Sequence, residues 1–257
     1  IAVKVTVVSL VLWASLASNA GAILMEIQSG TIGYFRGWYV YVSAIFMIMS
    51  LMLAVIPRTG RIRLGKDDSA PEFSRFAWFS MMFGAGIGVG MLTYSTAEPL
   101  AHFANNPDVI MGTTSALERE NLAAAYKWTL LHYGLTPWGC YAIVGMSLAY
   151  FAYRRDMPLT IRSPFTAVLN PETARRVGAV VDAAAILATI IGIGVTIGYG
   201  VNQLTFGMHQ ITAWDWLVNN GKPSLTALSL AVILLTLAAM LSALSGIGRG
   251  IRWLSNL

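Results

Sequence analysis

Cysteine is almost absent from this sequence, and the absence removes several kinds of site at once. Cys140 is the single cysteine among 257 residues, which excludes an intrachain disulfide and a thiolate metal site. The three histidines, His102, His132 and His209, are dispersed and lack the spacing of metal ligands. No Ser-His-Asp arrangement, phosphate-binding loop or pair of catalytic acids stands out. The sequence therefore predicts that the protein is not an enzyme.

Charge is also scarce, whereas long apolar runs are frequent. Charged residues make up 11% of the chain and hydrophobic residues 56%, against roughly 25% charged in an average soluble domain. Runs of more than about 18 apolar residues are typical of membrane-spanning helices. We expect six spans, at residues 5–27, 37–57, 76–100, 124–152, 179–206 and 225–245, and a seventh that begins near Gly246. The chain is predicted to be an all-α polytopic membrane protein.

The first apolar run has two interpretations. It follows Lys4, and Ala20-Gly21-Ala22 resembles a signal-peptidase site. Because the run is long enough to remain as a helix and the chain begins without Met, we interpret it as a retained span of a trimmed sequence.

The net charge of +5 follows the expected membrane topology. Thirteen of the 17 basic residues lie on one side of the predicted spans: Lys4, Arg58, Arg61, Arg63, Lys66, Arg75, Arg154, Arg155, Arg162, Arg175, Arg176, Arg249 and Arg252. Basic loops are typically cytoplasmic. We therefore expect this side to face the cytoplasm, with membrane lipid and not nucleic acid around the chain.

Four glycines at every second position, 84, 86, 88 and 90, lie inside the span 76–100. Each costs roughly 0.8–1 kcal/mol relative to Ala in a helix interior, and lipid cannot satisfy a frayed backbone. Glycines that let helices approach closely recur every fourth residue. The spacing of two favours a ligand-facing or partly unwound segment, with close helix packing as the alternative. We expect this helix to end at Glu98-Pro99, because a residue before proline avoids helical geometry.

The span 124–152 carries aromatic residues at helical spacing. Trp138 and Tyr141 share a face, Tyr133 lies nearby, and Pro137 is expected to kink the helix. Stacked aromatic faces bind quaternary ammonium groups through the ring quadrupole. From spacing alone, an aromatic belt or ordinary core is the favoured alternative, and Trp128 is interpreted as a belt residue.

Hydroxyl and amide groups form a stripe on the span 179–206. Thr189, Thr196 and Gln203 fall on nearly the same helix face. A threonine in an apolar helix either bonds a carbonyl four residues back, which is the commoner case, or coordinates an ion. The stripe favours a face that points into the helix bundle.

Taken together, several motifs resemble the betaine/choline/carnitine transporter family. They run in family order over nearly the whole chain: Arg63-Leu64-Gly65, Pro71-Glu72-Phe73-Ser74, Trp78 through the glycine stretch, Glu98-Pro99-Leu100, Pro137-Trp138 with Tyr141, Ala188-Thr189 with Gly192, and Gly250-Ile251-Arg252-Trp253-Leu254-Ser255.

The resemblance implies a transporter of twelve helices whose core consists of two inverted repeats of five. Residues 1–57 would form two peripheral transmembrane helices, 58–75 a cytoplasmic link, and 76–257 the first repeat, truncated at the start of the seventh helix. The chain would then be a fragment that cannot complete an alternating-access cycle. The resemblance also implies a homotrimer in the bacterial inner membrane.

The same resemblance implies secondary transport of a quaternary-ammonium or related onium solute, of the betaine, choline, carnitine or dimethylsulfoniopropionate type. The family's aromatic cage falls on Tyr133, Trp138 and Tyr141, with Tyr133 where many members have Trp. The family's substrate also approaches the glycine stretch, so the contact candidates there are Ala85, Gly86, Ile87, Gly88 and Gly90. Ile87 replaces a Met that is common in sodium-coupled members.

The resemblance leaves the driving ion open. Thr189 matches the first threonine of a sodium site, but Ile193 stands where the second is expected and offers no oxygen. Gly90 stands where some proton-coupled choline carriers bear an acid, which disfavours that mechanism. No cofactor is expected apart from coupling Na⁺. The alternative functions are an ion-coupled symporter of amino acids or other small solutes, and a non-transporting membrane sensor or scaffold.

Overall fold

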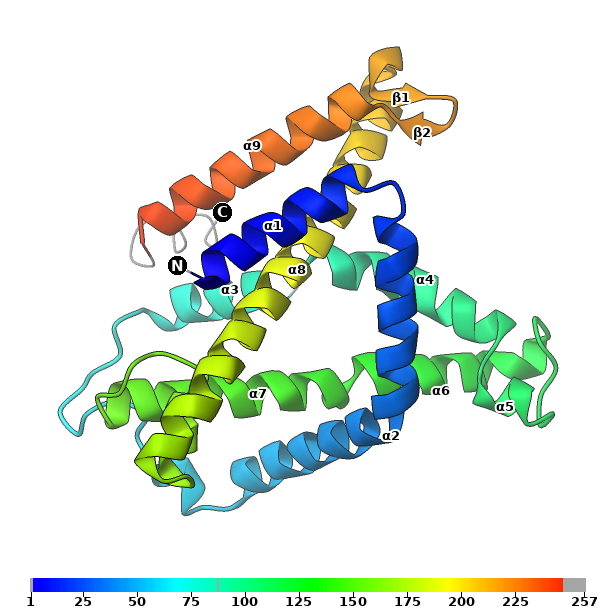
Figure 1. Ribbon diagram of the computed structural model, residues 1–257. Coiled ribbons are helices and arrows are strands. Elements are labelled where there is room, and N and C mark those ends of the chain that lie inside the picture. The colour runs from blue at the N-terminus through cyan, green and yellow to red at the C-terminus, as the bar shows by residue number, and fades with distance from the viewer. Residues whose placement is uncertain (1, 87, 247–257) are drawn as a thin grey trace. The chain divides into compact units, whose positions relative to one another are not determined.

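The structure is a computed structural model that describes residues 2–86 and 88–246, and these residues are mostly helical (Figure 1). The motif Gly250–Ser255 and Ile87 therefore lie outside the described residues. Residue contacts divide the chain into two compact units. The first unit comprises residues 1–69 and 126–188, and the second comprises 70–125 and 189–257.

The first unit is built from helices and short helical turns. It contains α1 (Ala2–Leu16), α2 (Ala20–Val55), a 3₁₀ turn (Thr59–Arg61), α6 (Leu122–Tyr133) from Tyr126 on, α7 (Leu135–Ala149), a π-helical turn (Tyr150–Arg154), a 3₁₀ turn (Ser163–Ala167) and α8 (Pro171–Thr212) up to Ala188.

The second unit adds a small β-hairpin to its helices. It contains α3 (Arg75–Gly86), α4 (Val89–Ala104), α5 (Pro107–Ile110), a 3₁₀ turn (Arg119–Asn121), the start of α6, α8 from Thr189 on, a 3₁₀ turn (Asp215–Leu217), β1 (Val218–Asn219), β2 (Lys222–Pro223) and α9 (Leu225–Leu244).

Within the described residues, three helices are long and apolar enough to cross a membrane: α2, α8 and α9. Helix α8 contains the expected span 179–206, and α9 matches the expected span 225–245. The first two spans differ from the prediction, because residues 28–36 are helical within α2 and the break between helices falls at residues 17–19. Segment 28–36 has no proline to end a helix. Its hydroxyl groups also find hydrogen-bond acceptors within the helix, since Ser29 and Thr31 donate to the carbonyls of Met25 and Ile27.

The expected spans 76–100 and 124–152 are each divided into two helices. The first divides between Gly86 and Val89, and the second divides at Gly134. A Cβ on Gly134 would overlap the Leu130 carbonyl oxygen, so only glycine fits there. The kink expected at Pro137 is therefore a break three residues earlier. Pro137 is the third residue of α7, where the backbone N–H has no partner within the helix to lose.

The predicted end of the glycine-rich helix at Glu98-Pro99 is wrong. Helix α4 continues to Ala104 with Pro99 inside it. A proline removes the one hydrogen bond to the carbonyl four residues back and leaves the rest of the helix ladder in place. The chain leaves the helix at Asn105, whose backbone is extended.

Two buried asparagines fix the segment that follows α4. The side chain of Asn106 accepts hydrogen bonds from the backbone N–H groups of Asp108 and Val109 and so caps α5. Its Nδ2 donates to Asn121 Oδ1 at 2.7 Å, and Asn121 Nδ2 donates to the Phe103 carbonyl at 2.7 Å. Asn121 is fully buried. The paired amides therefore hold the start of α6 against the end of α4 within the second unit.

The hairpin in the second unit was not anticipated. Val218 pairs with Pro223 and Asn219 with Lys222. The two residues between the strands, Asn220 and Gly221, have φ of 50° and 72°. Asn-Gly is the pair that a two-residue hairpin turn prefers, because both positions need positive φ.

In the first unit, α2 and α7 pack closely at one glycine, and Figure 1 shows α7 running beside the C-terminal arm of α2. Gly139 is buried, and a Cβ on it would lie 2.6 Å from Met47 Cα and 2.9 Å from Met47 N. Ser50 Oγ donates to the Gly139 carbonyl at 3.1 Å. A small residue thus lets the two backbones approach and adds a polar contact between the helices.

We expect Gly139→Ala to destabilise the protein by about 1–3 kcal/mol, the usual cost of an overpacked contact. The reason is that the new methyl group meets the Met47 backbone, which cannot rotate away as a side chain could. Thermal unfolding of the purified full-length protein in detergent measures the effect. Gly145→Ala on α7 is the matched control, since nothing lies within 4 Å of a Cβ there. Equal melting temperatures for the two variants would contradict the packing.

Exposed ion pairs join the link after α2 to the link after α7 in the first unit. Arg154 Nη1 donates to Asp67 Oδ1 at 2.6 Å and to the Gly65 carbonyl at 3.2 Å. Lys66 Nζ lies 3.3 Å from Asp156 Oδ1. The hydrogen bond from Arg154, together with its charge, lowers the pKa of Asp67 below its usual value.

The lowered pKa of Asp67 predicts a pH-dependent contribution to stability. The ionised carboxylate stabilises the fold above the ordinary pKa of an aspartate, and this contribution is lost as the pH falls through the lowered folded-state pKa. A double-mutant cycle with Asp67→Asn and Arg154→Gln should therefore show coupling at neutral pH that disappears in acid and weakens at high salt. Coupling that persists in acid would refute the assignment.

Candidate functional site

The glycine stretch contains the interruption between α3 and α4. Helix α3 ends at Gly86, and α4 begins at Val89. Gly88 is extended, with φ of −93° and ψ of 166°. The partly unwound segment expected from the alternate glycines is therefore present. Such an interruption leaves the first N–H groups of α4 without partners in the helix, so that a bound solute can accept their hydrogen bonds.

Four of the five candidate contact residues of this stretch lie among the described residues, and Ile87 does not. Ala85 and Gly86 form the end of α3, Gly88 lies in the interruption, and Gly90 is in the first turn of α4. Nothing lies within 4 Å of a Cβ built on Gly88 or Gly90. The glycines at these two positions are therefore not required by packing against a neighbouring element of their unit.

The next turn of α4 is tied to α8 within the second unit. Tyr94 Oη lies 2.7 Å from Tyr199 Oη, and the two rings meet edge to face with centroids 5.7 Å apart. Gln203 Nε2 donates to Thr93 Oγ1. Gln203 therefore points toward α4, in agreement with the expected polar stripe.

Thr196, another member of the stripe, bonds the Gly192 carbonyl of its own helix at 3.0 Å. Sequence reasoning missed Tyr94 and Tyr199, although a tyrosine between Gly198 and Gly200 in an apolar helix is a visible signal.

The aromatic pair of the predicted cage lies on α7 in the first unit. The ring centroids of Trp138 and Tyr141 are 5.8 Å apart, and the ring planes are tilted by 40°. Trp138 is 39% exposed and Tyr141 71% exposed. A cation is attracted within about 6 Å of a ring centroid, so rings at this separation can both reach one onium group.

Tyr133 lies on the other side of the break at Gly134. It is the last residue of α6, it is half-buried, and its ring meets that of His132 edge to face at 5.0 Å. The structure thus brings Trp138 and Tyr141 together, whereas the place of Tyr133 in the cage stays a prediction. The glycine stretch belongs to the other unit, so its pairing with the cage also stays a prediction.

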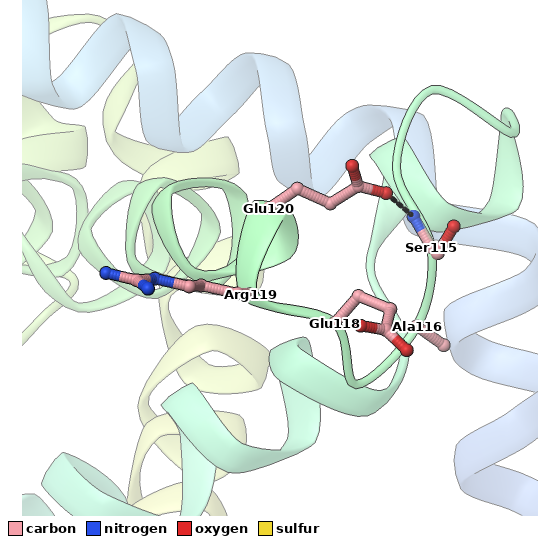
Figure 2. Close-up of a pocket in the computed structure, with 5 residues that line it drawn as sticks. All are labelled: Ser115, Ala116, Glu118, Arg119 and Glu120. Carbon is pink, nitrogen blue, oxygen red and sulfur yellow. Dashed lines mark hydrogen bonds between the residues drawn. The ribbon is translucent and has the colours of Figure 1, made fainter.

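Two hollows lie away from these residues. One, of about 760 Å³, is open and lined by Ser115, Ala116, Glu118, Arg119 and Glu120. The loop before the 3₁₀ turn Arg119–Asn121 supplies three of these residues, and the turn itself supplies Arg119 and Glu120. Figure 2 shows that Arg119 extends away from Glu118 and that Glu120 bonds Ser115. Glu120 accepts this hydrogen bond from the Ser115 N–H at 3.2 Å. The other hollow lies after α7 and is lined by Tyr150, Phe151, Arg155, Met157 and Ala167. Neither contains a predicted site residue.

Three helices that are long and apolar enough to cross a membrane, α2, α8 and α9, define the class as a helical membrane protein. The chain belongs to the betaine/carnitine/choline family of transporters, whose family model matches residues 1–257.

Individual relatives agree with this assignment. The osmo-dependent choline transporter of Acinetobacter baylyi is 39% identical over 219 residues, which cover 85% of this chain and 30% of that protein. The high-affinity choline transport protein of Escherichia coli is 37% identical over 86% of this chain and 31% of its own length. A betaine/ectoine transporter of Corynebacterium glutamicum is 37% identical over 86% of this chain and 34% of its own length. The chain thus spans about a third of the length of these relatives.

We expect Gly88→Ala in the full-length protein to keep its thermal stability and to lose solute uptake by about tenfold, which corresponds to about 1.4 kcal/mol. The backbone at Gly88 is one that alanine adopts freely, and its Cβ meets nothing within 4 Å. A loss of uptake would therefore report the approach of the solute to this backbone and not a folding defect.

Gly207→Ala on α8 is the matched control, because its Cβ also meets nothing within 4 Å and it lies outside the predicted site. Uptake that is normal in Gly88→Ala would argue against close approach of the solute at this position.

Proposed function

We propose that the full-length protein is a secondary transporter that carries an onium solute, of the betaine, choline, carnitine or dimethylsulfoniopropionate type, across the bacterial inner membrane. Membership of the family supports this proposal, as do relatives named for choline and betaine transport. The basic links would face the cytoplasm, as the positive-inside rule predicts. The same proposal includes the two-repeat architecture and the homotrimer. It also includes the division of the chain at residues 57 and 75 into peripheral helices, cytoplasmic link and first repeat.

The observation that carries the proposed site is the ring pair on α7. Trp138 and Tyr141 present two aromatic faces 5.8 Å apart, and both rings are accessible. Desolvated cation–π contacts contribute about 2 kcal/mol or more each. The onium head would lie on these rings and on Tyr133, and the rest of the solute would approach the backbone from Ala85 to Gly90.

The proposed driving force is an ion gradient or exchange of solutes. Thr189 is the candidate for an ion ligand on α8, but its counterpart one turn further is Ile193, which is 53% exposed and has no oxygen donor. A sodium site at this position would need ligands from residues other than Ile193. Uptake into proteoliposomes with and without a sodium gradient separates sodium coupling from exchange.

Substitutions of Trp138 in the full-length protein test the cage. Uptake should fall in the order Trp, Phe, Leu, because phenylalanine keeps a smaller ring face and leucine has none. Trp138→Leu should reduce uptake by at least about tenfold. Trp128→Leu on α6 is the control that removes the same area of indole outside the cage. Equal effects of Trp138→Leu and Trp128→Leu would overturn the site assignment.

Competition experiments test the substrate class with the same proteoliposomes. Glycine betaine, choline, carnitine and dimethylsulfoniopropionate should compete for uptake, whereas amino acids that lack an onium group should not. Competition by ordinary amino acids would favour the alternative symporter, and a protein that transports none of them would favour a sensor or scaffold.

A further inference from the structure

The hollow after α7 has an apolar wall and a cationic rim. Its volume is about 570 Å³, and its lining residues all belong to the first unit: Tyr150, Phe151, Arg155, Met157 and Ala167. Phe151 and Met157 supply apolar surface, and their backbones are joined by a hydrogen bond from Met157 N to the Phe151 carbonyl at 3.0 Å. The rings of Tyr150 and Phe151 meet edge to face at 5.4 Å.

The π-helical turn places Arg155 over this wall. Arg155 N donates to the Tyr150 carbonyl five residues back at 3.2 Å, a bond that is typical of a π turn. The guanidinium carbon lies 5.5 Å from the Tyr150 ring centroid, and Nε donates to Tyr150 Oη at 3.1 Å. Stacking on the ring and this single bond hold the guanidinium in place. No hydrogen bond from residues 2–86 and 88–246 engages its two Nη groups, which can therefore bind a ligand.

Arg155 and its chain neighbour Arg154 differ in their ionic partners. Three other arginines of this unit each have a carboxylate partner: Arg154 with Asp67 at 2.6 Å, Arg162 with Asp182 at 3.3 Å, and Arg176 with Glu172 at 2.6 Å. Across residues 2–86 and 88–246, no carboxylate forms an ion pair with Arg155. The hollow therefore carries a positive charge that nothing described in the chain neutralises.

We propose that this hollow binds an anionic phospholipid, with the phosphate on Arg155 and the start of an acyl chain along Phe151 and Met157. Arginine forks match the geometry of phosphate oxygens. Basic hollows at the ends of membrane helices attract anionic lipids. A lipid accounts for the apolar wall, which a free phosphate would leave uncovered. The proposal does not depend on the transported solute.

Titration of the purified, delipidated full-length protein with phosphatidylglycerol, followed by native mass spectrometry, tests the proposal. Arg155→Gln should weaken phosphatidylglycerol binding by about tenfold, the order expected for the loss of one charge-assisted contact. Ala167→Trp, which keeps Arg155 but fills the hollow, should weaken it as well. Both positions are exposed, and melting temperatures without lipid check that both variants fold.

The matched control is Arg176→Gln, which removes the same charge from the partner of Glu172 and should leave the affinity unchanged. Equal weakening by Arg155→Gln and Arg176→Gln would show attraction by net charge and overturn the site. The site would also be overturned if phosphatidylcholine with the same acyl chains bound as tightly as phosphatidylglycerol. Unchanged phosphatidylglycerol binding in Ala167→Trp would overturn it as well. Displacement of the lipid by millimolar inorganic phosphate would show that the arginine takes a free anion, and the lipid assignment would be wrong.

Discussion

The structure depends on one constraint, which is that lipid offers no hydrogen bonds to a peptide backbone. Apolar stretches of this chain must therefore be helical, and any interruption has to be compensated by protein, water or a ligand. Three interruptions lie inside expected spans, at residues 17–19, at Gly88 and at Gly134. The last two adjoin predicted site residues, since Gly88 is one itself and Gly134 separates Tyr133 from the ring pair on α7. At these two positions an interrupted helix adjoins residues of the proposed solute site.

Polar side chains of the helices obey the same constraint. Hydroxyls such as those of Thr31 and Thr196 return to carbonyls of their own helix. Other polar side chains reach a polar group of another helix, as the hydroxyl of Tyr94 meets that of Tyr199. In the links between helices, charged side chains also find partners, as Arg154 forms an ion pair with Asp67. Arg155, next to Arg154, forms no ion pair with a carboxylate of the described residues and lines a hollow with an apolar wall.

Much of the helical organisation was predictable because hydropathy and glycine spacing act locally. The apolar runs 179–206 and 225–245 lie within α8 and α9, and the alternate glycines do interrupt a helix. Helix ends were less predictable, because proline rules describe a tendency that neighbouring contacts can outweigh. Helix α4 passes through Pro99 and ends beside the buried pair of asparagines. The hairpin at Asn220-Gly221 had a clear local signal that was overlooked.

The sequence by itself determined the helical membrane class and the family, because composition and motif order need no knowledge of distant contacts. It also predicted which residues would form an onium site. Only the tertiary structure decided that a break at Gly134 replaces a kink at Pro137, and that Trp138 and Tyr141 lie 5.8 Å apart. It alone showed that Gly139 packs against Met47 and that no carboxylate of the described residues forms an ion pair with Arg155. Each of these findings depends on distances between atoms that only folding brings about, and these distances cannot be read from a single stretch of sequence.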